Sequence, residues 1–178
     1  MKNILFKTLL ICSIFLLPSC MDSDTGDSYL TWKEDNESFF QQMEDSIDAT
    51  TGKLYYTKLY SEAYPSQYLL YRALVTSDNT DTINANSTVY VNYNGRLYNT
   101  EDFFDEGNDV KFRVDQLIEG WSLALQNMHK GDKWELIIPW ELGYGMSGSA
   151  PSILPYSTLI FDVDVLDVDY EIGTNPEK

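Results

Sequence analysis

Few residues of this chain could carry out nucleophilic, metal-assisted or acid–base chemistry. The single histidine, His129, lies in the segment 128–131, which has the pattern of a turn between a helix and a strand. A Ser-His-Asp triad or a zinc site needs its histidine in a cleft with partner residues. We therefore expect His129 to be a solvated turn residue. The carboxylates, 28 in all, are too numerous for any one pair to indicate a site.

Three glycines formally match the dinucleotide-binding fingerprint. Gly143, Gly145 and Gly148 have its spacing, but that motif requires a strand before it and a helix after it. Here Pro139 precedes the glycines and Pro151 follows them. We therefore interpret the match as fortuitous, and the sequence predicts neither a cofactor nor a metal.

The first 19 residues have the pattern of an export signal. Two lysines precede an apolar run over 9–17, which is shorter than the roughly 20 residues of a membrane-spanning helix. The run ends in Leu-Pro-Ser followed by Cys20, which resembles the lipobox of bacterial lipoproteins. The resemblance implies lipidation of Cys20, an acidic tether over 20–30, and a location in the bacterial cell envelope, at the outer membrane. An ordinary signal peptide over 1–19 is the alternative.

The charge balance limits the possible partners. The chain has 12 Lys and Arg against 28 Asp and Glu, a formal net charge of −16. Nucleic acid is excluded as a partner because its phosphates need a cationic surface, and an anionic lipid surface is equally unfavourable. Attachment to a membrane would therefore depend on the lipid. Removal of the first 19 of 178 residues leaves 159, enough for one domain and a small appendage.

The segment 31–65 is predicted to be a helical appendage. Thr31 and Glu34 have the spacing of a capping box, and apolar residues then recur on one face of a helix over about 31–48. The tyrosine-rich stretch over 53–65 is expected to pack against the main domain.

From residue 66 the apolar period changes to that of strands. The predicted strands are 68–75, 88–93, 133–140 and 158–168. A short amphipathic helix is predicted over 117–128, and Asn94–Gly95 has the signature of a turn or bulge. Polar stretches over 78–87 and 99–109 predict loops. The segment 66–170 is therefore predicted to be an α+β domain, followed by a tail over 171–178.

Several sequence blocks resemble the FKBP-type peptidyl-prolyl cis-trans isomerases. They are VYVNYNGRL at 89–97, FD at 104–105, LIEGWSLALQNMHKGDK at 117–133, IPWELGYG at 138–145 and ILPYSTLIFDV at 153–163. The blocks have the family's order and near-family spacing across about 66–170. The resemblance implies an antiparallel sheet wrapped around one short helix, and a rotamase activity on proline-containing polypeptides.

The resemblance also implies an aromatic pocket. Its catalytic residues here would be Tyr93, Phe104, Asp105, Trp121, Tyr144 and Phe161, and its further substrate-binding residues Leu117, Ile118, Ile153, Val110 and Phe112. Trp121 would form the floor, and the Tyr144 hydroxyl and the Ile118 N–H would donate hydrogen bonds to substrate carbonyls.

This sequence departs from the family pattern at three positions. Val110 stands where an aromatic residue is usual, Leu154 replaces a proline, and Ser152 stands where an apolar residue is frequent. We expect these changes at the rim of the pocket. They leave two alternatives to an isomerase of exported proteins: a non-catalytic peptide-binding module, and a surface lipoprotein subunit that uses the appendage.

Overall fold

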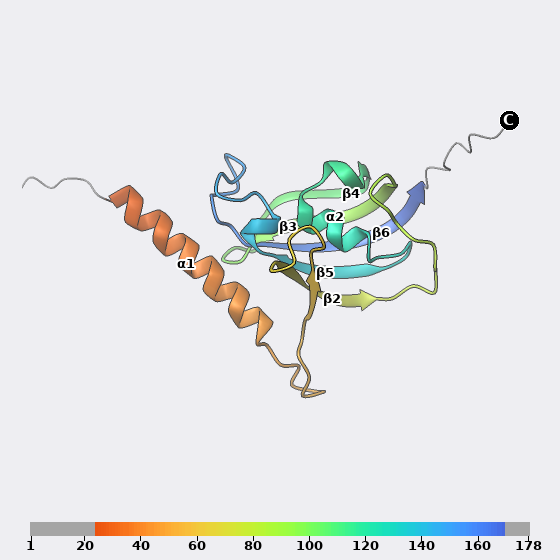
Figure 1. The fold of residues 1–178 in the computed structure, drawn as a ribbon, viewed down its shortest axis with the longest axis horizontal. Helices are drawn as coiled ribbons and strands as arrows, with labels where there is room; N and C mark the ends of the chain where they lie inside the picture. The colour runs from red at the N-terminus through yellow and green to blue at the C-terminus, as the bar shows by residue number, and fades with distance from the viewer. Residues whose placement is uncertain (1–23, 170–178) are drawn as a thin grey trace, which may run out of the picture.

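The computed structural model describes residues 24–169, which form one antiparallel sheet and two helices (Figure 1). The sheet has the strand order β1-β2-β5-β6-β3-β4. The strand bounds are Thr57–Tyr60 (β1), Tyr68–Val75 (β2), Thr88–Leu97 (β3), Phe103–Arg113 (β4), Lys133–Ile138 (β5) and Leu159–Asp169 (β6). Helix α1 (Asp24–Glu44) precedes the sheet, and α2 (Glu119–Leu125) connects β4 to β5. The predicted α+β fold, a sheet around one short helix, is confirmed.

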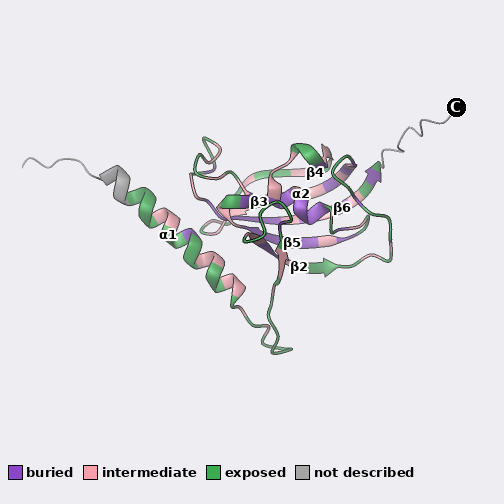
Figure 2. Cartoon of the chain, in the orientation of Figure 1, coloured by how far each residue is buried: buried purple, intermediate pink, exposed green. Residues whose placement is uncertain are grey.

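The core lies between α2 and the sheet. Figure 2 shows the buried residues concentrated in α2 and in the central strands. A Cβ at Gly120 would lie 2.5 Å from the Cγ2 of Ile138 in β5, so glycine at this position permits α2 to lie close to the sheet. The next residue, Trp121, is thereby held in the core with 4% of its surface exposed.

Strand β3 is longer than predicted, and of the turn or bulge expected at Asn94–Gly95 it is the bulge that forms, because the β3–β4 register shifts between Gly95 and Arg96. Gly95 pairs with Asp105 of β4 on one side and with Phe161 of β6 on the other. A Cβ at this position would lie 2.4 Å from the Phe161 ring and 2.8 Å from the Phe104 ring. Glycine is therefore needed here for the close approach of two rings and not for a chain reversal.

The polar stretch over 99–109 was also misassigned from its composition. Most of it belongs to β4, whose residues are largely exposed because β4 is an edge strand. An edge strand with one solvated face is rich in polar residues, so its composition resembles that of a loop. The predicted strands over 68–75 and 158–168 agree with β2 and β6, to within one residue at each end.

The appendage differs from the prediction in two ways. Helix α1 begins at Asp24 and ends at Glu44, so it includes the second half of the expected tether and stops before residue 48. Strand β1 pairs with β2, so the sheet begins before residue 66. The predicted leader over 1–19, the lipidated Cys20 and the tail over 171–178 lie outside the described residues.

Helix α1 runs along one side of the sheet (Figure 1). Its half-buried Trp32 and Phe39 both contact the ring of Tyr98, and Phe40 contacts Tyr68 of β2. Neither of the helices in the described part of the chain combines the length and apolar content needed to cross a membrane.

The contacts at Gly95 predict a stability effect. Gly95→Ala should lower the free energy of unfolding by about 1–3 kcal/mol, the usual cost of overpacking, because the new methyl meets two rings that are already packed. Chemical denaturation measures this change. Arg96→Ala, at the next position of the strand, is the control and should change stability by less than about 0.5 kcal/mol. Equal stability of Gly95→Ala and wild type would show that the rings move aside without cost.

Candidate active site

A cavity of about 220 Å³ opens between α2, strands β3, β4 and β6, and the loop that follows β5. Its lining is mainly apolar and aromatic. The lining residues are Tyr93, Phe104, Asp105, Phe112, Gln116, Leu117, Ile118, Trp121, Tyr144 and Phe161. The volume is below the roughly 300–1,000 Å³ of sites for drug-sized ligands, so the cavity suits one small side chain with its adjoining amides.

Trp121 forms the floor of this cavity. The rings of Tyr93 and Phe161 meet its indole edge to face, with centroids 5.3 and 5.2 Å away and interplanar angles of 90° and 89°. The Phe112 ring lies 5.9 Å away at 75°. Edge-to-face contacts are a preferred arrangement of aromatic rings. The floor and its walls therefore support one another.

Phe104 of β4 adds a further aromatic ring to the wall of the cavity. Its ring meets that of Phe161 at 90° with centroids 5.5 Å apart. Both rings lie against Gly95, which pairs with the strands on either side of β3. The sheet register thus brings Phe104 and Phe161 together although they are far apart in the sequence.

The polar groups of the cavity are few, and one pair is already hydrogen-bonded. The Tyr93 hydroxyl donates to Oδ2 of Asp105 at 2.9 Å. Burial, and then this hydrogen bond and the carboxylate charge, raise the pKa of Tyr93 to about 12. Tyr93 is therefore a neutral donor at physiological pH, and it orients the Asp105 carboxylate.

Two further donors have no partner within the described residues. The structure gives no hydrogen bond to the hydroxyl of Tyr144, a residue that is 39% exposed, and none from the N–H of Ile118 among residues 24–169. Burial raises the pKa of Tyr144, with the charge of Asp105 as a second cause. Tyr144 thus also stays protonated, and both groups can donate to carbonyl oxygens of a bound peptide.

The structure brings together nine of the eleven pocket residues expected from the sequence, and it adds Gln116. Ile153 lines an adjoining depression of about 160 Å³, which shares Phe104, Asp105 and Tyr144 with the cavity. Val110 does not line either of them. It packs over Gly107, next to the left-handed Asp109 (φ 52°) and a register shift between β3 and β4.

Gln116 was missed because it is polar and lies in a short 3-10 turn, Val114–Gln116, that the helical pattern did not include. His129 lies outside the cavity, and its N–H donates to the buried Asp132 carboxylate at 2.8 Å.

Comparisons with known proteins agree with this geometry. A family profile described as "FKBP-type peptidyl-prolyl cis-trans isomerase" matches residues 79–166. A probable FKBP-type isomerase of Haemophilus influenzae is 49% identical over 92 residues, which are 50% of this chain and 38% of that protein. The isomerase FkpA of Escherichia coli is 34% identical over 151 residues, which are 83% of this chain and 49% of that protein. The chain thus spans half or less of the length of these curated relatives.

Two solved structures share the fold. A crystal structure of a peptidyl-prolyl cis-trans isomerase from Pseudomonas syringae superposes with a TM-score of 0.66 at 27% identity, covering 79% of this chain and 96% of that one. The crystal structure of FkpA from Escherichia coli has a TM-score of 0.64 at 32% identity, covering 81% of this chain and 64% of that one. Residues over most of the described range therefore have counterparts in these folds.

The Tyr93–Asp105 pair predicts a titration. Asp105→Asn removes the carboxylate charge, so the pKa of Tyr93 should fall from about 12 but stay above 10, because burial remains the larger cause. NMR of labelled tyrosine rings against pH measures it, with Asp167→Asn, remote from the cavity, as the control. An unchanged Tyr93 pKa in Asp105→Asn would show that burial alone sets it.

Proposed function

We propose that this chain, which belongs to the FKBP-type peptidyl-prolyl cis-trans isomerase family, catalyses the isomerisation of X–Pro bonds in polypeptides. The observation that supports the proposal most is the aromatic cavity over Trp121, whose lining includes two donors, the Tyr144 hydroxyl and the Ile118 N–H, that have no partner among residues 24–169. A proline ring is the small apolar group that such a cavity fits.

The proposed mechanism depends on the polarity of the amide. The X–Pro bond isomerises over a barrier of about 18–20 kcal/mol because the C–N bond has partial double-bond character. In the twisted transition state this resonance is lost, and the charge separation across the amide decreases. Water stabilises the planar, more polar ground state better than an aromatic cavity does. Transfer of the bond into the cavity therefore lowers the barrier.

The chain's polar groups would orient the substrate. The Tyr144 hydroxyl and the Ile118 N–H donate to carbonyl oxygens that flank the proline, which holds the peptide in a turn-like conformation. The bond rotates without a covalent intermediate or a proton transfer, so the reaction requires no nucleophile and no general base.

The positions of the three residues that depart from the family pattern favour an enzyme over a non-catalytic binding module. Val110 lies outside the cavity, Ser152 lines only the adjoining depression, and Leu154 is 42% exposed. The floor and the donors are unaffected by these three residues.

The substrates and location are part of the same proposal. The signal-like residues 1–19 and the following Cys20 support a lipid-anchored protein of the bacterial cell envelope, at the outer membrane, that acts on exported proteins. One lipid chain alone binds membranes only reversibly, whereas two or more acyl chains on Cys20 would anchor the protein stably.

Unequal effects of pocket substitutions test the catalytic proposal. Tyr144→Phe keeps the ring and loses one hydrogen bond, worth about 0.5–1.5 kcal/mol, so kcat/KM should fall about 2- to 12-fold. Phe104→Ala opens the wall of the cavity to water and should lower kcat/KM more than Tyr144→Phe does. Turnover of a prolyl tetrapeptide measures both variants.

His129→Ala is the control for that series. Its side chain lies outside the cavity, so kcat/KM should be unchanged and the rate should not vary with pH through the histidine range. If the wild-type protein binds prolyl peptides without turning them over, the binding module is the correct function.

Lipid anchoring gives a separate prediction. Cys20→Ser removes the thiol that would carry the lipid, so the protein should leave the membrane fraction or retain its leader. Fractionation and intact-mass measurement follow the change, with Cys12→Ser, inside the leader, as the control. An unchanged mass and membrane partition of Cys20→Ser would contradict the anchor.

A further inference from the structure

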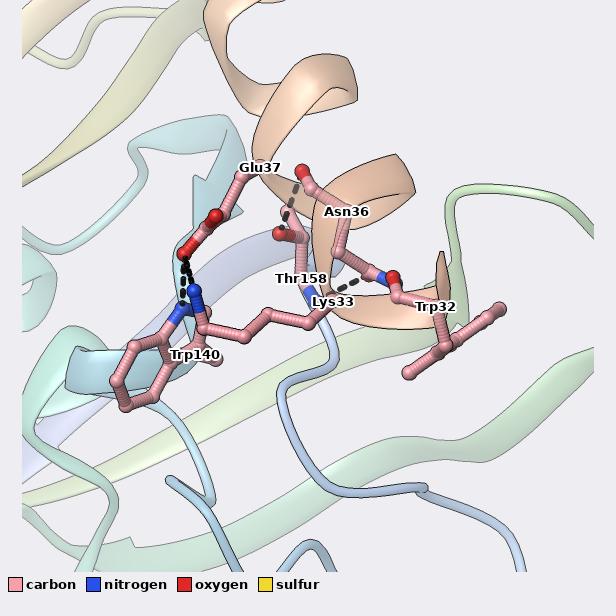
Figure 3. A network of polar contacts seen from close by, with 6 residues as sticks. All are labelled: Trp32, Lys33, Asn36, Glu37, Trp140 and Thr158. Carbon is pink, nitrogen blue, oxygen red and sulfur yellow. Dashed lines mark hydrogen bonds and ion pairs between the residues drawn. The ribbon is translucent and has the colours of Figure 1, made fainter. Parts of the chain in front are cut away.

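Helix α1 contacts the loop over 139–158, which carries part of the active site. This loop connects β5 to β6 and contains Tyr144 and Ile153. Figure 3 shows Asn36 of α1 facing Thr158 at one end of the loop, and Lys33 and Glu37 beside Trp140 at the other. The helix therefore touches both ends of the same loop.

The contact at Thr158 is buried and fully paired. Asn36 has no exposed surface, and its Oδ1 accepts the Thr158 N–H at 2.7 Å. The Thr158 hydroxyl donates to the Asn36 carbonyl oxygen at 3.3 Å, and Asn36 Nδ2 donates to the carbonyl oxygen of Trp32 at 2.7 Å. The last bond fixes which end of the amide faces Thr158. A buried backbone N–H that loses its acceptor destabilises the folded state, so the bond from Thr158 to Asn36 holds this end of the loop in place.

The contact at Trp140 is more exposed. Glu37 pairs with Lys33 at 2.5 Å and accepts the Trp140 indole N–H at 3.4 Å. The Lys33 ammonium lies 5.8 Å from the ring centroids of both Trp140 and Tyr156, which themselves meet edge to face at 5.1 Å. These solvated contacts are individually weak. They orient Trp140 at one end of the loop and Tyr156 near the other, whereas Asn36 holds only the Thr158 end.

Inside the loop, the path from these ends to Tyr144 is short. The Gly145 N–H donates to the Trp140 carbonyl oxygen at 2.9 Å, and the Tyr156 N–H donates to the Gly145 carbonyl oxygen at 3.0 Å. Gly145 is the neighbour of Tyr144, so both loop ends meet at the residue that follows the active-site tyrosine. Displacement of Thr158 would therefore reach Tyr144 along two residues of chain and the Tyr156–Gly145 backbone hydrogen bond.

We propose that Asn36 is a positioning residue for the active-site loop, and that through it α1 sets the place of the Tyr144 hydroxyl at the cavity. The consequence for turnover rests on the proposed isomerase function, whereas the consequence for the loop does not. Asn36 touches no substrate in this arrangement. It acts through Thr158 and the loop backbone.

Substitutions at Asn36 in the full chain test this role. Asn36→Leu keeps the branched shape and the number of side-chain heavy atoms but offers no acceptor to Thr158, so kcat/KM for a prolyl tetrapeptide should fall about three- to tenfold, mainly through KM, because Tyr144 is less well placed for binding. Asn36→Asp keeps an acceptor oxygen but repels the Trp32 carbonyl. It should therefore retain more activity than Asn36→Leu even where the two are equally destabilised. Asn36→Ala replaces the leucine variant if that one does not fold.

Glu44→Gln is the matched control. Glu44 is on the same helix and is bonded to Lys58 and Tyr68 of the sheet, not to the loop. Its loss should lower stability and leave KM unchanged. If activity follows stability alone across the Asn36 and Glu44 variants, or if Asn36→Asp is no more active than Asn36→Leu, Asn36 has only a structural role and the proposal is wrong.

Amide hydrogen exchange keeps this test separate from the isomerase function. Asn36→Leu should accelerate exchange at Gly145, Tyr156 and Thr158 by about tenfold or more, with the β5–β6 ladder unchanged. Unchanged exchange in the loop would overturn the positioning role. Absence of wild-type turnover would overturn the isomerase function alone, since the exchange result still decides whether Asn36 holds the loop.

Discussion

The close approach of α2 to β5 is the constraint on which the rest of the site depends. It requires glycine at position 120, because any Cβ there would meet Ile138. The approach places Trp121 in the core and in the cavity lining at once. The same indole therefore contributes to stability and gives the three surrounding rings a common surface. A floor that is part of the packed core cannot move away when a ligand enters, so the cavity is preorganised.

The polar groups of the cavity divide into a satisfied pair and open donors. Asp105 already accepts the Tyr93 hydroxyl, so a carboxylate at the rim remains oriented without taking the hydroxyl of Tyr144. The raised pKa values of Tyr93 and Tyr144 keep both phenols protonated through the physiological range. The site thus presents donors and apolar surface, with one oriented carboxylate. This is the composition expected where an amide must be held by its carbonyls and otherwise desolvated.

The sequence predicted those features that depend on side-chain identity and strong periodicity. Strands β2 and β6 follow from their apolar runs, and most of the cavity follows from motifs that keep their spacing. The errors arose where a local pattern competes with tertiary contacts. Asn94–Gly95 is typical of a turn or a bulge, and only its pairing with both neighbouring strands shows that the bulge forms and that Gly95 leaves room for two rings. The family resemblance implies a pocket position for Val110, but the register shift beside Asp109 places it outside the cavity. A periodic pattern cannot show such a shift, because it depends on the partner strand.

The role of Asn36 could not be predicted from the sequence, because it depends on a contact with a distant residue. An asparagine in the middle of a helix has low helix propensity, and the sequence around Asn36 does not predict a role for it. Its partner Thr158 is 122 residues away. The family profile covers 79–166 and includes neither α1 nor β1, yet β1 pairs with the sheet and α1 contacts the loop that carries Tyr144. Residue 66 therefore marks where the family resemblance begins. It does not mark a boundary in packing, because β1 and α1 pack against the domain. The packed unit that carries the cavity therefore includes β1 and α1.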